Sequence, residues 1–114
     1  TQALGTIFNG AIFWNADLRR ASLSMCDLRG ASFEGSDLRN VELGSSLVDY
    51  DFLEKMDSSK DIKGAKEIVD KYRIVKYNYK DKDYFFLWYK NDEIKDMKGF
   101  VEYFINLWTK FNIG

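Results

Sequence analysis

The sequence predicts two domains: a repeat solenoid over residues 1–52 and a small α-β-β-α domain over residues 53–114. Three observations lead to this division. Large apolar residues recur at every fifth position from residue 6 to about residue 50, the period is lost in a charged stretch, and helix-like and strand-like patterns follow. A fixed period indicates a solenoid, because each unit buries its apolar face only against its neighbours.

The composition narrows the range of partners. The chain has 114 residues, of which 46% are hydrophobic and 17% aromatic, enough for a real core. Seventeen Lys and Arg residues against eighteen Asp and Glu residues give a formal net charge of -1. Such a balance produces no global field that would attract nucleic acid or an anionic membrane. Neither is therefore an expected partner.

Catalytic and metal chemistry are not expected either. The chain contains no histidine, which excludes a Ser/His/Asp triad, a Cys/His pair and imidazole metal ligands. We therefore expect no enzyme, no catalytic residues, no cofactor and no bound metal. The single Cys26 cannot form an internal disulfide, no apolar run is long enough to cross a bilayer, and we expect no secretory signal. These features favour a cytoplasmic location.

One position of the five-residue repeat holds a large apolar residue nine times in succession. These residues are Phe8, Phe13, Leu18, Leu23, Leu28, Phe33, Leu38, Leu43 and Val48. Two positions earlier the residue is small in nearly every repeat, as in Ala11, Ala16, Ala21, Cys26, Ala31, Ser36 and Ser46. An α-helix would scatter such a column around its circumference, and a strand would send alternate members to opposite faces. Neither element could bury this pattern.

The repeat resembles the pentapeptide-repeat family, whose signature A(D/N)LXX appears as Ala16-Asp17-Leu18-Arg19-Arg20 and, with Cys or Ser in first place, at residues 26–30 and 36–40. The resemblance implies a short right-handed quadrilateral parallel β-helix of about two coils, in which residues twenty apart stack in one column. So short a stack needs its ends covered. Cys26 would occupy the small inward position, where a buried thiol behaves as a small hydrophobe.

The outward positions carry charge pairs and one tryptophan. An Asp precedes and an Arg follows the central Leu in three repeats, giving Asp17/Arg19, Asp27/Arg29 and Asp37/Arg39. One interpretation is a solvated lattice of weak surface ion pairs. The other is an interaction face with the arginines as anchors, since Arg is enriched at binding hot spots. Trp14 also projects outward, and is either covered by the second half of the chain or available to a partner.

The second half predicts two helices and a hairpin. Residues 54–66 are charged and helix-like, and Ser58 or Ser59 is a suitable cap for a helix that carries Ile62, Ala65, Ile68, Val69 and Tyr72 on one side. Residues 73–80 and 84–90 are β-prone and are joined by residues 81–83, which predicts a hairpin. A final amphipathic helix begins at Asp92 or Asp96 and carries its apolar residues at helical spacing through Phe111.

The final helix predicts self-association. Tyr103 and Ile105 widen its apolar arc to roughly 200°, more than one contact surface requires. We therefore expect a homodimer through Tyr103, Ile105 and Trp108, by analogy with family members that dimerise at their C-terminal end. The competing surface is the first coil around Ile7, Phe8 and Ile12.

Two further candidate sites have simpler explanations. Asp81 and Asp83, with Asp92 and Glu93, form an acidic group that turn chemistry explains without a cation, because the spacing of a calcium loop is absent. The aromatic residues 84–89 with the nearby lysines, Lys76, Lys80 and Lys90, offer a platform for single-stranded bases, but ordinary core packing accounts for them.

The sequence therefore favours a non-catalytic protein–protein interaction module, acting as an inhibitor or adaptor of a macromolecular partner. Its expected partner-binding residues are Trp14, Arg19, Arg39, Tyr103 and Ile105. The alternatives are single-strand binding through the hairpin, or a DNA-mimicking inhibitor of a nucleic-acid enzyme such as a topoisomerase. The second alternative follows from the family resemblance, but the arginines interrupt the acidic columns that a phosphate mimic needs.

Overall fold

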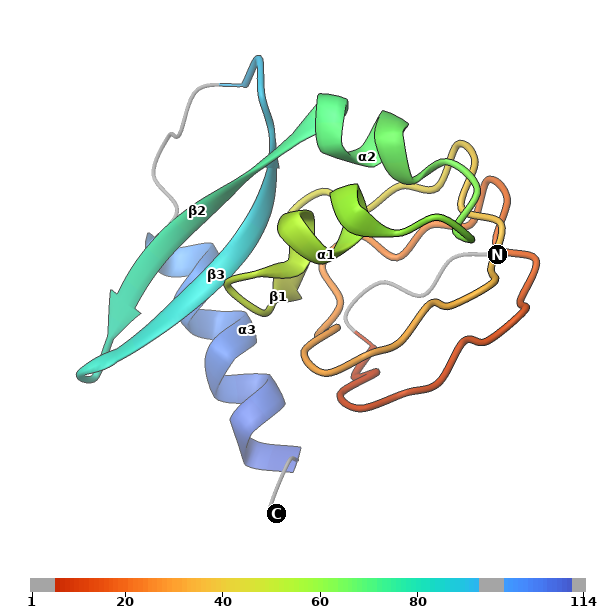
Figure 1. Cartoon of the computed structure of the whole chain (residues 1–114). Coiled ribbons are helices and arrows are strands. Elements are labelled where there is room, and N and C mark those ends of the chain that lie inside the picture. The colour runs from red at the N-terminus through yellow and green to blue at the C-terminus, as the bar shows by residue number, and fades with distance from the viewer. Residues whose placement is uncertain (1–5, 93–97, 112–114) are drawn as a thin grey trace.

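The computed structural model describes residues 6–92 and 98–111 (Figure 1). Residues 6–50 form irregular coils at one end of the molecule. Helices α1 (Phe52–Ser58) and α2 (Ala65–Lys71) lie along these coils, and the hairpin of β2 (Tyr72–Tyr79) and β3 (Lys82–Tyr89) follows. The described chain ends in helix α3 (Lys98–Phe111). The two-residue strand β1 (Leu47–Val48) joins the coils to the hairpin.

The coils have the geometry of a parallel β-helix. Parallel bridges join residues twenty apart, as in Ile7 with Asp27, Ile12 with Ser32, Asp17 with Asp37, and Ser22 with Glu42. Because each repeat has five residues, one coil contains four repeats and each repeat forms one side. The column that begins at Ile7 continues through Asp27 to Leu47.

Each side ends in a tight turn that requires a positive φ. At the first corner the Ala11 N–H donates to the Phe8 carbonyl at 2.9 Å, and the same bond recurs at most later corners. The residue before the donor has a φ between 55° and 72° at every corner, namely Gly10, Asn15, Arg20, Met25, Gly30, Gly35, Asn40 and Ser45. This is the third position of a type II turn, where Gly and Asn are preferred. The repeat therefore includes a backbone requirement as well as an apolar one.

The predicted inward column is confirmed. Leu23, Leu28, Phe33, Leu38, Leu43 and Val48 are buried, whereas Phe8, Phe13 and Leu18 in the first coil are only half-buried. Phe13 and Phe33 stack with nearly parallel rings, 5.1 Å between centroids. Cys26 is buried among these residues, as the small inward position requires.

No complete third coil follows the second; other elements cover its end. The loop before α2 supplies one strand-like contact, since Lys63 forms a parallel bridge with Asp37. This loop lies so close to the coil that a Cβ on Gly64 would be 2.9 Å from the backbone nitrogen of Arg39. The sheet order is β1-β3-β2, with Leu47 opposite Phe86, so the hairpin extends one side of the β-helix.

One hydrophobic core therefore runs through both halves of the chain. It joins the inward residues of the coils to Phe52 and Met56 of α1, Ala65 and Ile68 of α2, and Tyr72 and Leu87 of the hairpin. The predicted boundary between residues 52 and 53 falls at the start of α1, and the core is continuous across it.

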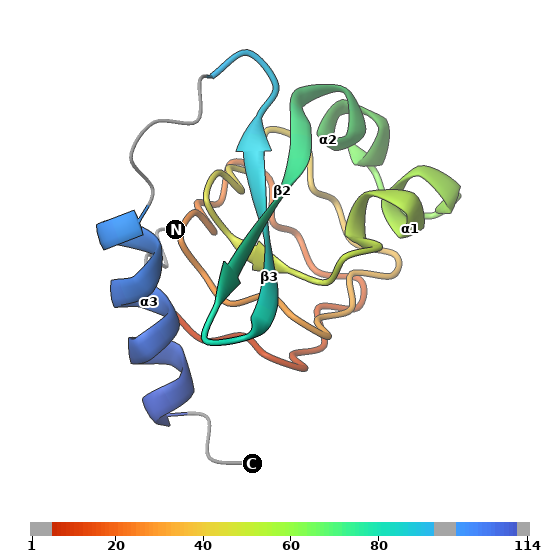
Figure 2. The ribbon, with the colours of Figure 1, turned by 90° about the vertical axis from the view of Figure 1, so that its left-hand side faces the viewer.

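A second core lies between the hairpin and α3. Val101, Ile105 and Trp108 of α3 are buried against Leu47, Tyr84 and Phe86. Figure 2 shows α3 on one side of the hairpin, with α1 and α2 on the other. The expectation that Ile105 lies at the margin of the apolar arc is wrong, because it stands four residues after Val101 and three before Trp108, so that all three lie on one face of the helix.

The remaining differences from the predicted elements are local. Two short helices replace the single one, and Tyr72 begins strand β2 instead of ending a helix. The hairpin turns at Lys80 and Asp81, both with positive φ, rather than at residues 81–83. Of the two expected starts of the final helix, Asp92 is not helical and Asp96 lies outside the described residues.

The positive φ at the corners predicts that replacing a corner glycine lowers the stability of the fold and that introducing a corner glycine raises it. Gly30→Ala should destabilise the fold by about 1 kcal/mol, because a Cβ disfavours the left-handed region while meeting only ordinary contacts at 3.6 Å. Arg20→Gly should stabilise it by a similar amount. Urea unfolding measures both. Gly99→Ala in α3 is the control of opposite sign, since alanine favours a helix and no atom lies within 4 Å. Equal effects at residues 30 and 99 would contradict the assigned corner.

Candidate interaction surface

The chain covers two of the four sides of its own β-helix. We number the sides by their residues: side 1 (6–10, 26–30 and 46–50), side 2 (11–15 and 31–35), side 3 (16–20 and 36–40) and side 4 (21–25 and 41–45). Side 1 continues into the sheet, and its outward residues Ile7 and Leu47 pack in the second core with α3. Sides 2 and 3 carry the exposed residues considered below.

Side 4 is covered by the end of the hairpin. The Tyr89 ring lies directly over Gly44, where a Cβ would be 2.7 Å from the ring. The Tyr89 hydroxyl donates a hydrogen bond to Glu42, and Lys71 lies 3.5 Å from the same carboxylate. Burial and this hydrogen bond raise the pKa of Tyr89 well above its usual value. These contacts fix the hairpin on the coils.

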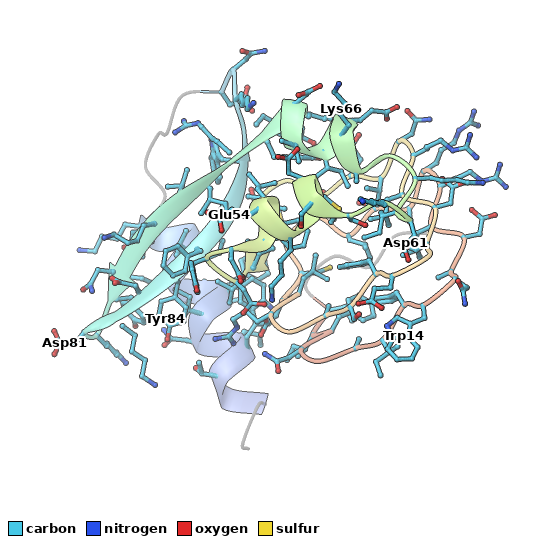
Figure 3. The ribbon with its side chains drawn as sticks, in the orientation of Figure 1. Trp14, Glu54, Asp61, Lys66, Asp81 and Tyr84 are labelled. Atoms are coloured by element: carbon cyan, nitrogen blue, oxygen red, sulfur yellow. The ribbon has the colours of Figure 1, made fainter. Side chains whose placement is uncertain are left out.

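Side 2 exposes two large apolar side chains. Ile12 is 65% exposed and Trp14 is 57% exposed, and both project outward from the first coil. The Trp14 indole N–H donates to Ser32 Oγ at 2.8 Å, which holds the ring against the second coil. In Figure 3, Trp14 projects from the edge of the coils. Of the two interpretations of Trp14, the described structure therefore supports an exposed ring.

Side 3 carries two stacked ion pairs. Arg19 donates to both oxygens of Asp17 at 2.9 and 2.8 Å, and Arg39 donates to both oxygens of Asp37 at 2.9 and 2.6 Å. These hydrogen bonds hold the pKa of Asp17 at about 2 and lower the pKa of Asp37. At neutral pH both carboxylates are therefore charged, and both oxygens of each accept a hydrogen bond from an arginine. Side 3 does not present the open acidic columns that a phosphate mimic needs.

A hollow of about 570 Å³ opens at the outer end of side 3. It is lined by Asp17, Arg19, Arg20, Arg39 and Asn40. Arg20 makes no ion pair with any residue in ranges 6–92 and 98–111, so the hollow has an excess of positive charge. The sequence interpretation missed Arg20 and Asn40. The signal was present, because Arg20 stands at a corner where the repeat favours Gly or Asn, and strained backbone is concentrated at functional sites.

The third Asp/Arg pair behaves differently, although its motif is the same. The Asp27 side chain is 0% exposed, and Arg29 donates to its two oxygens at 3.0 and 2.8 Å. The Arg29 guanidinium also lies 5.9 Å from the centre of the Tyr84 ring. The interpretation as a fully solvated lattice is therefore wrong for side 1, because the hairpin and α3 cover this side.

The predicted partner-binding residues of the C-terminal helix differ in their exposure. Tyr103 is 62% exposed on α3, but Ile105 is 2% exposed and Trp108 is also buried against the sheet. The predicted contact through Ile105 and Trp108 is therefore wrong. Of the three residues predicted for the C-terminal homodimer, only Tyr103 is exposed. Tyr103 lies on α3, which covers side 1, so it is not part of the surface on sides 2 and 3.

The hairpin and its turns carry the two further candidate sites, the aromatic platform and the acidic group. Tyr84, Phe86 and Leu87 are buried in the two cores, as the packing interpretation requires. Asp83 accepts a hydrogen bond from Asn78 across the hairpin at 3.0 Å. Glu93 lies outside the described residues, and within the described ranges no three Asp, Glu or Cys side chains cluster as metal ligands. In the same ranges, no helix has the length and apolar character of a membrane span.

The comparison with protein families identifies the repeats. The family model of pentapeptide repeats matches residues 5–35 and 26–45, in eight copies. The N-terminal part of this chain is therefore built of pentapeptide repeats, as its signature indicates. The matched residues span less than half of the chain. Comparisons with curated proteins and with solved structures found no match.

The Asp27/Arg29 pair is buried and the Asp17/Arg19 pair is exposed, so removing the arginine from each pair should affect stability differently. Arg29→Ala should destabilise the protein by about 3 kcal/mol, because it leaves the Asp27 carboxylate buried without its partner. Arg19→Ala removes the same side chain from the same motif, but Asp17 is exposed to water, so the change in stability should be small. Urea unfolding compares the two variants. Equal losses would show that side 1 is no more buried than side 3.

Proposed function

We propose that this protein is a non-catalytic interaction module that binds a protein partner through sides 2 and 3, as an inhibitor or adaptor. The observation that carries the proposal is the joint exposure of Ile12 and Trp14 on a hydrogen-bonded coil, while the chain's own elements cover the other two sides. Exposed apolar groups with a polar surround mark protein-binding surfaces, and Trp and Arg are the commonest anchors.

The frame suits this role because it is held in place without a partner. Backbone hydrogen bonds join Phe13 to Ser32 at 2.7 Å and Leu18 to Asp37 at 2.9 Å, directly beneath the exposed side chains. The Trp14 ring is already oriented by Ser32. A partner therefore meets a preorganised surface and loses little conformational entropy in ordering it.

The repeat supports the class of function. Pentapeptide repeats commonly serve as non-catalytic interaction modules. In our proposal the frame is the right-handed quadrilateral β-helix of about two coils that the resemblance implies. The cytoplasm remains the proposed compartment, since the only cysteine, Cys26, occupies a buried packing position.

Affinity capture from the source cell, with the whole tagged chain as bait, tests the proposal. Trp14→Ala and Arg39→Glu should each weaken binding of the captured partner, the first by about 30-fold, because truncating a hot-spot anchor costs about 2 kcal/mol or more. Lys82→Glu is the matched control, since Lys82 is an exposed residue beside the hairpin turn, which Figure 3 marks at Asp81 and shows at the opposite end of the molecule from Trp14. Circular dichroism verifies that each variant is folded.

Two results would contradict the proposal. One is capture that survives both substitutions on sides 2 and 3. The other is an equal loss in Lys82→Glu, which would place the contact elsewhere or attribute it to net charge alone.

A further inference from the structure

The second coil has one open backbone edge. In the first coil the N–H of each central residue donates to the coil above, as in Phe13 to the Ser32 carbonyl and Leu18 to the Asp37 carbonyl. In the second coil the corresponding donors find substitutes on three sides. Leu28 donates to the Leu47 carbonyl at 2.8 Å, Leu38 to the Lys63 carbonyl at 2.8 Å, and Leu43 to the Tyr72 hydroxyl at 2.9 Å.

Side 2 lacks such a substitute. The Phe33 N–H, the Gly35 N–H and the Ala31 carbonyl have no hydrogen-bond partner among residues 6–92 and 98–111. On the neighbouring side 3, the group equivalent to the Ala31 carbonyl is the Ser36 carbonyl, which accepts from the Lys63 N–H at 3.0 Å. Three consecutive ladder groups are therefore unpaired on one edge, and an unpaired edge of this kind is a template for pairing with another chain.

Helix α1 explains why the edge is open. By the five-residue period, residues 51–55 would form side 2 of a third coil, but they begin helix α1 instead, whose N–H and carbonyl groups bond within the helix. Phe52, its first residue, turns its N–H back to the Asp49 carbonyl at 3.1 Å and packs its ring against Phe33. The side-chain core is thus filled, while the backbone edge beside it remains unpaired.

The open edge lines a groove of about 540 Å³. One wall is the strand of residues 30–34, and the other is formed by α1 and the loop through Asp61 and Ile62, which Figure 3 marks at Asp61. Phe33, Phe52, Met56 and Ile62 contribute apolar surface. The charged lining residues are Glu34, Asp49, Asp51, Asp61, Lys55 and Lys60, a balance of -2. The groove therefore favours a peptide that carries positive charge.

The arrangement matches recognition by strand addition, in which a peptide in extended conformation completes a sheet edge. We propose that this edge binds an extended lysine- or arginine-bearing segment of a protein partner, added parallel to residues 31–35. The Lys63 contact with side 3 gives the register. One peptide residue would donate to the Ala31 carbonyl and accept from the Phe33 N–H, and the residue two further on would accept from the Gly35 N–H.

The same register determines which peptide side chain lies beside a charged residue of the groove. The second of these peptide residues falls in the column of Trp14 and Glu34, with its side chain pointing outward beside the Glu34 carboxylate. Glu34 makes no ion pair within the described ranges, so a peptide lysine or arginine at this position would pair with it. The inference rests on the proposed function, and adds to it the backbone conformation and the charge of the segment that binds.

Solution NMR of the whole chain tests the edge without requiring the partner. In the free protein, the Phe33 and Gly35 amides should exchange with solvent at least about 100-fold faster than the bonded Leu38 and Leu43 amides. The probe is a blocked seven-residue peptide of alternating valine and lysine. It should shift and protect the Phe33 and Gly35 amides, and bind at least about 10-fold more tightly than the matched peptide of valine and glutamate.

Two modifications make the test specific. N-methylation of the lysine backbone nitrogens, which face the edge, should abolish binding, whereas N-methylation of the valine nitrogens should be tolerated. Glu34→Lys should remove the preference for the lysine peptide. Glu54→Lys is the control, because Glu54 is an exposed α1 residue outside the groove lining.

The inference is overturned if the Phe33 and Gly35 amides are protected in the free chain. It is also overturned if the lysine peptide at millimolar concentration leaves them unshifted, or if both N-methylated peptides bind equally. Because these readouts do not depend on Trp14 or Arg39, a failure here leaves the capture result intact, and a failed capture leaves this result intact.

Discussion

The apolar residues at the end of the second coil have to be covered, and the arrangement of residues 52–92 and 98–111 follows from this requirement. The inward column ends in Phe33, Leu38, Leu43 and Val48, which belong to the same core as α1, α2 and the hairpin. Burying a side chain of this size contributes about 1.5–3 kcal/mol, so two coils with an open end would lose a large part of their stability. The hairpin and helices therefore belong to the same hydrophobic core as the repeats.

The way in which the end is covered determines where the protein can bind. The hairpin extends side 1 through β1 and fixes side 4 through Tyr89, and α3 then covers side 1. Sides 2 and 3 keep Ile12, Trp14 and the arginine hollow exposed. On side 2 a helix replaces the coil, which fills the core but leaves backbone groups unpaired. One structural solution thus creates both the exposed side chains and the open edge.

Local patterns predicted the parts of the fold that are themselves local. The five-residue period identified the inward column, and alternation and helical spacing identified the hairpin and α3 to within a few residues. The same patterns could not separate Asp27/Arg29 from Asp17/Arg19, because burial depends on which later segment returns over each side. The contact between Lys63 and Asp37 was not predicted for the same reason. The burial of Ile105 could have been predicted from its spacing to Val101 and Trp108. Nothing in the sequence around Lys63, in contrast, marks it as a partner of Asp37.

Native-state amide exchange over a range of urea concentrations tests the shared core most directly. If the coils and the second half form one cooperative unit, the Leu23 and Leu28 amides of the coils and the Leu87 amide of the hairpin should open with the same free energy. Their urea dependence should also be the same, because the same surface is exposed in each case. The contrary result is a coil that remains protected while the hairpin opens at markedly lower free energy, which would show that the β-helix is stable without its cover.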